Sequence, residues 1–155
     1  MPIPEQQATL YHRLDNSHSL MRAARAIALG MSLDLKQRVG AVIARNGAIL
    51  GVGANGSGYH ALHGCRRKEL GCKTGEGYDL CEGCSPQNHA EAAALAHARS
   101  RGIDVAGAQV VMWGHWWACR DCWASLRIAG IDRISLIHDA RSYFDPESPD
   151  FGSAP

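Results

Sequence analysis

Two short motifs contain the residue types that bind transition metals. The stretch "HAE" places an imidazole and a carboxylate two residues apart, at His89 and Glu91. The stretch "ACRDC" places two thiols three residues apart, at Cys119 and Cys122. Because residues i and i+3 share one face of a helix, both sulfurs can reach a single ion. Taken alone, the cysteine pair could also form a disulfide, a redox dithiol or half of a structural zinc site.

His89, Cys119 and Cys122 together predict a catalytic zinc site. One imidazole and two thiolates leave the fourth position of a tetrahedral zinc ion open, as catalytic sites require. Zinc lowers the pKa of a bound water to about 7. Glu91 can point toward that water without binding the metal, and a carboxylate there can take and return a proton. A purely structural zinc site would have no use for Glu91.

A second group of cysteines lies in residues 55–88, a stretch of 34 residues without clear periodicity that contains seven glycines. A structureless loop of this length is uncommon in a compact domain, so something must offset its ordering entropy. Four thiolates could close a structural zinc site here, and His60 or His63 could replace one of them. The four thiols are those of Cys65, Cys72, Cys81 and Cys84. The alternative is a set of free thiols in a flexible loop.

Aromatic and basic residues near these motifs are candidates for substrate contact. Trp116 and Trp117 are adjacent, so we expect them to point in opposite directions and one of them to line the pocket and stack on a base. Packing at a strand end is the alternative. The basic residues of the 55–88 segment are most simply a solvated surface, although they could neutralise a phosphate. They are Arg66, Arg67, Lys68 and Lys73.

The elements that must position these residues follow from local patterns. Apolar spacing predicts a helix over 17–32, and two β-rich runs, 39–44 and 48–54, flank Asn46-Gly47 as in a hairpin. Helices over 88–102 and 119–130 each precede a short apolar strand, at 109–113 and 133–138. Strands that alternate with helices imply parallel pairing and helical layers on both sides of one sheet.

Length and composition limit the classes of protein to consider. The chain of 155 residues fits one domain, and we divide it into a domain of residues 1–140, which includes the 55–88 insertion, and a surface tail of residues 141–155. The formal net charge of +1 gives no field for a long nucleic acid. Neither a membrane-length apolar run nor a secretory signal is evident, so we expect a reducing cytoplasmic location, where cysteine pairs more often bind metals than form disulfides.

The combination of HAE and ACRDC resembles the zinc-dependent cytidine and deoxycytidylate deaminase superfamily, whose signature is H-x-E with P-C-x-x-C. Ala118 stands where that signature has proline, which removes no ligand. The similarity covers residues 18–138 and is greatest to the deoxycytidylate deaminases, some of which carry a cysteine-bearing loop before HAE.

The resemblance implies a three-layer α/β/α sandwich with a mixed five-stranded sheet, although only four strands are evident in the sequence. It also implies hydrolytic deamination of a small cytosine nucleotide, foremost dCMP to dUMP and ammonia, by a homo-oligomer. Glu91 would then shuttle protons, and Asn55 in "GANG" would hold the sugar. The alternatives are a deaminase of adenine, of guanine or of a base in RNA or DNA, and a non-catalytic zinc-binding module.

Overall fold

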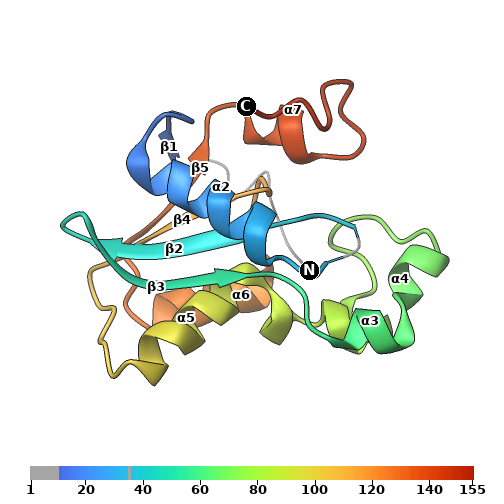
Figure 1. The fold of residues 1–155 in the computed structure, drawn as a ribbon, viewed down its shortest axis with the longest axis horizontal. Coiled ribbons are helices and arrows are strands. Elements are labelled where there is room, and N and C mark those ends of the chain that lie inside the picture. Colours follow the sequence, from blue (N-terminus) through green and yellow to red (C-terminus); the bar gives the residue numbers. More distant parts are fainter. Residues whose placement is uncertain (1–10, 35) are drawn as a thin grey trace.

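The computed structural model describes residues 11–34 and 36–155, so residues 1–10 of the predicted domain lie outside the described residues. Five strands and three longer helices form the body of the molecule (Figure 1). In chain order they are β1 (Tyr11–Leu14), α2 (Ser19–Met31), β2 (Gly40–Arg45), β3 (Ala48–Ala54), α5 (Ala90–Ser100), β4 (Gln109–Trp113), α6 (Arg120–Ile128) and β5 (Arg133–Ile137). Shorter helices occupy the 55–88 segment and the C-terminal region.

The strands form one mixed sheet in the order β1-β5-β4-β2-β3. Strands β1, β5 and β4 are parallel, whereas β2 runs antiparallel to both β4 and β3. The predicted hairpin is confirmed: Asn46 and Gly47 both have positive φ, at 53° and 79°, as the turn of a tight hairpin requires. The fifth strand, which only the family resemblance predicts, is β1. It pairs with β5 at one edge of the sheet.

Helices cover both faces of the sheet, so the predicted three-layer α/β/α sandwich is confirmed (Figure 1). Helix α2 packs on one face, and α5 and α6 pack on the other. Strand β3 lies close to α5 because Gly53 has no side chain, and a Cβ there would overlap the backbone of Ala90 and Ala94. This close packing fixes the first turn of α5, which carries the HAE motif.

The 55–88 segment contains short helices rather than an irregular loop. They are α3 (Tyr59–His63), α4 (Arg66–Glu69), η2 (Tyr78–Leu80), η3 (Glu82–Cys84) and η4 (Pro86–Asn88). Figure 1 shows the segment beside the sandwich, on the side where α2 ends and α5 begins. None of these elements exceeds five residues, which explains why no periodicity predicts them.

The division at residue 140 crosses a helix, α7 (Ala140–Phe144). The ring of Phe144 is buried against Trp113 at a centroid distance of 4.9 Å, so the beginning of the predicted tail packs on the sheet. Beyond Asp145 most residues are exposed. Within residues 11–34 and 36–155, no helix is both long and apolar enough to cross a membrane.

Candidate active site

The two motifs meet at the beginnings of α5 and α6. Nδ1 of His89 lies 3.4 Å from Sγ of Cys119 and 3.5 Å from Sγ of Cys122. Zn–N and Zn–S bonds of about 2.05 and 2.3 Å place the nitrogen and sulfur ligands of one tetrahedral zinc ion about 3.5 Å apart. The three donors therefore fit one zinc ion, with one position of the tetrahedron left for a water molecule or a substrate.

Sheet topology brings the two helix starts together. His89 is the N-cap of α5, which precedes β4, and Cys119 is the N-cap of α6, which precedes β5. Because β4 and β5 are parallel neighbours and both helices pack on the same face, the two helices begin at the same edge of the sheet. The side chains that begin α5 and α6 meet there, as the sequence predicts.

The tautomer of His89 suits a metal ligand. Its Nε2 lies 3.1 Å from the carbonyl oxygen of Cys84. A carbonyl oxygen can only accept a hydrogen bond, so Nε2 carries a proton, and Nδ1 is the ring nitrogen that faces the thiols and can bind a metal when it has no proton of its own. The ring of Tyr78 packs edge-on against the imidazole at 4.9 Å and helps to fix its orientation.

Charges and burial shift the pKa values of this group in opposite directions. The contact with Cys122 lowers the pKa of the Cys119 thiol to about 5, with help from His89 and against the effect of burial. The Glu91 side chain is only 4% exposed, and burial raises its pKa although the neighbouring His89 lowers it. The site therefore combines a thiolate with a buried carboxyl group whose proton is held more tightly than usual.

A pocket opens beside the three donors, and Glu91 lines it together with His89 and Cys119. Two cationic side chains, Lys36 and Arg67, also line it. The cluster therefore borders a pocket, as a catalytic site requires.

Asn55 lines the pocket, and its amide also forms hydrogen bonds with Ser32, Gln37 and Val39. Its Oδ1 accepts hydrogen bonds from the Ser32 hydroxyl at 2.6 Å and from the backbone N–H of Val39 at 2.8 Å. Its Nδ2 donates to the carbonyl oxygen of Gln37 at 2.7 Å. The second N–H of the amide has no hydrogen-bond partner among residues 11–34 and 36–155, so any contact with a sugar would come from this group.

The two tryptophans differ as expected for adjacent residues. Trp117 is buried and lines the pocket, whereas Trp116 is half-buried and stacks on His115 outside the pocket lining. His115 lines the pocket too, and its Nδ1 accepts a hydrogen bond from the backbone N–H of Trp117 at 3.2 Å. Burial lowers the pKa of His115 to about 3, so its ring is neutral at physiological pH.

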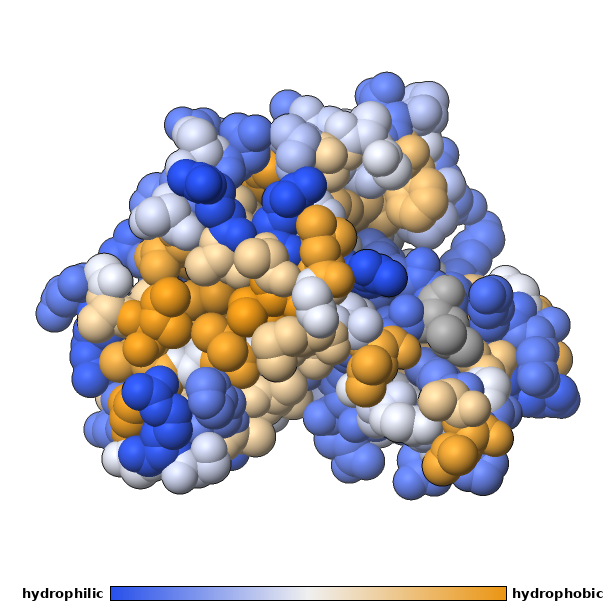
Figure 2. Space-filling view, viewed as in Figure 1, coloured by the Kyte–Doolittle hydropathy of each residue, from blue (hydrophilic) through white to orange (hydrophobic). Residues whose placement is uncertain are grey.

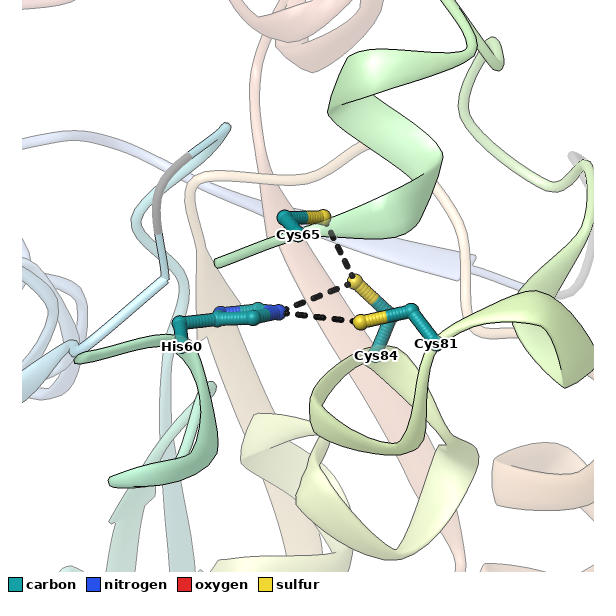
Figure 3. Close-up of side chains that lie close together, drawn as sticks. All are labelled: His60, Cys65, Cys81 and Cys84. Atoms are coloured by element: carbon teal, nitrogen blue, oxygen red, sulfur yellow. Dashed lines mark hydrogen bonds between the residues drawn. The ribbon is translucent and has the colours of Figure 1, made fainter. Parts of the chain in front are cut away.

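A second group of possible metal donors lies in the 55–88 segment, and it includes three of the four cysteines that the sequence singles out. His60, Cys65, Cys81 and Cys84 converge, and all four are buried (Figure 3). Cys72 does not belong to this cluster: it is half-buried after α4, beside Gly77. His63 is exposed, so His60 is the histidine that lies with the three cysteines.

Sequence reasoning missed several residues that shape the pocket. Tyr78 contacts His89, and the Tyr11 hydroxyl accepts a hydrogen bond at 2.8 Å from the N–H of Ala118, directly before Cys119. Gln37 lines the pocket and donates to the carbonyl oxygens of Gly114 and Phe144. None of these residues belongs to a motif, because each reaches the site through tertiary packing.

Comparisons with solved structures agree with the fold. Two crystal structures of the dCMP deaminase from the cyanophage S-TIM5 are similar over 78% of this chain and 82% of theirs. The apo form is 22% identical with a TM-score of 0.53, and the complex with dCMP and dUMP is 24% identical with a TM-score of 0.54. At these identities the likeness is one of fold. A deaminase–reductase from Thermotoga maritima is 18% identical over 83% of this chain and 29% of its own, with a TM-score of 0.48.

Comparison with sequence families is more decisive. No curated protein matches the chain. The model of the cytidine and deoxycytidylate deaminase zinc-binding region matches residues 14–138, which include both motifs and the whole 55–88 segment. The chain is therefore a zinc-dependent deaminase of the cytidine and deoxycytidylate deaminase family.

Proposed function

We propose that the protein hydrolyses the exocyclic amino group of a cytosine nucleotide, converting dCMP to dUMP and ammonia. The observation that carries this proposal is a buried carboxyl group, that of Glu91, in a pocket beside three convergent metal donors. His89, Cys119 and Cys122 would hold the zinc ion. Bound zinc supplies a water molecule whose pKa is near 7, so that a nucleophile is available at neutral pH.

Glu91 would move the protons of the reaction. It accepts a proton from the attacking water and delivers it to N3 of the base, and it then transfers the second proton of that water to the departing amino group. A C4–O bond forms, the C4–N bond breaks, and ammonia leaves. Burial supports this role, because it raises the pKa of Glu91 toward the range in which a carboxyl group both takes and returns protons.

The remaining pocket residues would orient the nucleotide. Trp117 offers an aromatic surface to the base, and Asn55 offers the free N–H of its amide to the sugar. Neutral His115 adds a polar wall without a competing positive charge.

The cationic side chain of Lys36 supports a phosphorylated substrate rather than a free nucleoside. Lys36 lines the pocket and is half-buried, and its Nζ also donates to the carbonyl oxygen of Cys72. Arg67 lines the pocket too, but the carbonyl oxygens of Lys73 and Glu76 already bind its guanidinium group. The carboxylate of Asp34, also in the lining, already accepts hydrogen bonds from the backbone N–H groups of Lys36 and Gln37 at 2.8 Å. The cyanophage deaminase of similar fold is described with dCMP and dUMP bound, which agrees with a monophosphate.

We also propose that the protein acts as a homo-oligomer in a reducing, cytoplasmic environment. Figure 2 shows hydrophobic residues gathered over β2 and β3, between α2 and α5. Ile49 of β3 and Leu29 and Met31 of α2 are large apolar residues that are at least 40% exposed. A second copy of the chain could cover such a surface. A reducing environment would keep the clustered cysteines available as thiolate ligands.

An ammonia-release screen tests the substrate. The purified protein would be incubated in parallel with cytosine, deoxycytidine, dCMP, dCTP, adenine, guanine and a single-stranded DNA oligonucleotide. We expect dCMP to give the highest kcat/KM. Preferential turnover of a purine, or of the oligonucleotide, would overturn the proposed substrate and leave the deaminase chemistry intact.

A further inference from the structure

We propose that His60, Cys65, Cys81 and Cys84 bind a second zinc ion, which is structural and folds residues 55–88 into a wall of the substrate pocket. This ion has no part in the deamination itself. The inference does not depend on which base the enzyme accepts, because it rests on a separate cluster of side chains.

The geometry of the cluster matches a closed tetrahedral site (Figure 3). Nε2 of His60 lies 3.3 Å from Sγ of Cys81 and 3.5 Å from Sγ of Cys84, and the sulfurs of Cys65 and Cys84 are 3.6 Å apart. Four ligands on one zinc ion lie about 3.5 to 3.8 Å apart, given the usual Zn–N and Zn–S bond lengths. The donor set, one imidazole and three thiolates, is a known structural type.

The same distances argue against a disulfide. Two bonded sulfurs lie about 2.05 Å apart, far closer than the 3.6 Å between Cys65 and Cys84. All six cysteines of the chain are free. The donors are therefore placed as separate ligands around a common centre.

Residues 55–88 bury few apolar side chains that could replace the metal: besides the cysteines, only Tyr59 and Tyr78 pack partly buried against the cluster. The buried residues of the segment are His60, Cys65, Arg67, Cys81, Gly83 and Cys84. Its leucines point outward: Leu62 is 82% exposed, Leu70 51% and Leu80 48%. Since no aliphatic side chain of the segment is buried, hydrophobic burial offsets little of the entropy of ordering it, and zinc coordination would supply the rest.

Two glycines allow the chain to form the cluster. Gly64 has a φ of 71°, which turns the chain sharply between His60 and Cys65. Gly83 lies directly beneath the His60 ring, and a Cβ there would be 2.7 Å from Nε2. The turn from Cys81 to Cys84 is closed by a backbone hydrogen bond of 3.1 Å and presents both sulfurs to the same side.

A buried arginine balances the charge that such a site would carry. Three thiolates and a neutral imidazole on Zn²⁺ have a net charge of −1. Arg67 is 5% exposed, and it lines the same pocket as Cys84. Among residues 11–34 and 36–155 no carboxylate forms a salt bridge with Arg67; its other contacts are the carbonyl oxygens of Lys73 and Glu76 and the ring of Tyr78. A buried cation without a carboxylate fits beside an anionic metal centre.

Zinc content, measured by mass spectrometry on the purified chain after gel filtration, tests the proposal. We expect two zinc ions per chain in the natural sequence and one in Cys65→Ser or His60→Ala. Cys72→Ser is the matched control, because it removes a thiol from the same segment outside the cluster, and it should retain both ions. One zinc ion per chain in the natural sequence would overturn the proposal, as would an equal loss in Cys72→Ser.

A second experiment leaves residues 55–88 unchanged and removes the metal of the catalytic cluster instead. In Cys122→Ser, which removes a ligand of the catalytic cluster, we expect one retained zinc ion. X-ray absorption spectroscopy should find about three sulfur atoms and one nitrogen atom around it. A retained ion with one sulfur ligand, or complete loss of zinc, would contradict a second site. Deaminase activity is not a readout of either experiment, so failure here is distinct from failure of the proposed substrate.

Discussion

The backbone oxygen of Cys84 accepts a hydrogen bond from Nε2 of His89 at 3.1 Å, while the sulfur of Cys84 faces His60 and Cys65. One residue thus contacts both clusters. The proton on Nε2 leaves Nδ1 free to bind metal, so the position of this carbonyl oxygen bears directly on the catalytic ligand. Folding of the 55–88 segment and the chemistry at the beginning of α5 are physically connected through Cys84.

Replacement of Glu91 should separate metal binding from catalysis. We expect Glu91→Gln to keep its zinc content. Its kcat should fall by about 10²–10⁴-fold, because an amide cannot accept and return the proton. Ammonia release measured beside metal analysis tests this. Glu82→Gln, an identical change at an exposed residue, should retain full activity. Substantial turnover by Glu91→Gln would contradict the proton-transfer role.

Removal of metal should occur in two stages. A site with three protein ligands and an open position is more accessible to a chelator than a closed site with four. During dialysis against dipicolinate we expect activity to disappear with the first zinc ion and the melting temperature to fall with the second. Metal content, turnover and thermal unfolding measured on the same samples would check the order. Simultaneous loss of both ions with all activity would argue against two sites of different kinds.

Lys36 should distinguish nucleotide from nucleoside. We expect Lys36→Met to raise KM for dCMP by about 10- to 100-fold, since a charged hydrogen bond contributes about 1.5–3 kcal/mol. Deoxycytidine, which has no phosphate, should be affected far less. Lys68→Met, an exposed control outside the pocket lining, should leave both values unchanged. An equal effect of Lys36→Met on both substrates would exclude a phosphate contact.

Asn55 should matter for stability as well as for activity. In Asn55→Ala, the buried N–H of Val39 loses its acceptor and the carbonyl oxygen of Gln37 loses a donor. An unsatisfied buried polar group costs about 1–3 kcal/mol, which should be measurable by urea unfolding. A loss of activity at unchanged stability would instead assign Asn55 to the substrate alone.

Two glycine substitutions should differ in their effect on stability. Gly53→Ala pushes a Cβ into the backbone of α5, and we expect destabilisation of about 1–3 kcal/mol with a lower kcat, because α5 carries the catalytic motif. Gly30→Ala in α2 meets no atom within 4 Å and should be neutral or stabilising by up to about 1 kcal/mol. Urea unfolding of both variants provides the comparison. Equal stability of the two would show that α5 can move away from β3.

The sequence predicts the parts of this molecule that depend on short-range patterns. His89 and Cys119 lie at the beginnings of helices that alternate with parallel strands, so local motifs and simple topology are enough to bring them together. The Asn46-Gly47 turn is also local. Strand β1 is different: its four residues, "YHRL", are mostly polar, and only pairing with β5 makes them a strand.

The sequence also does not predict which residue is the fourth donor of the second cluster. Cys72 and His60 are both near Cys65 in the sequence, and spacing alone does not decide between them. The turn at Gly64 directs His60 into the cluster, while α4 carries the chain away before Cys72. Packing of Phe144 on Trp113 was likewise invisible, because the Pro-, Ser- and Asp-rich sequence that follows resembles a tail.

The outward-facing leucines of the 55–88 segment affect how the chain folds after synthesis. The sandwich can assemble from its own apolar side chains, but the segment that borders the substrate depends on an ion from the surroundings. When zinc is scarce, the sandwich would therefore fold while residues 55–88 stay unfolded beside the pocket and become sensitive to proteases. Limited trypsin digestion at Arg66 or Lys68 would then measure the fraction of molecules that lack this zinc ion.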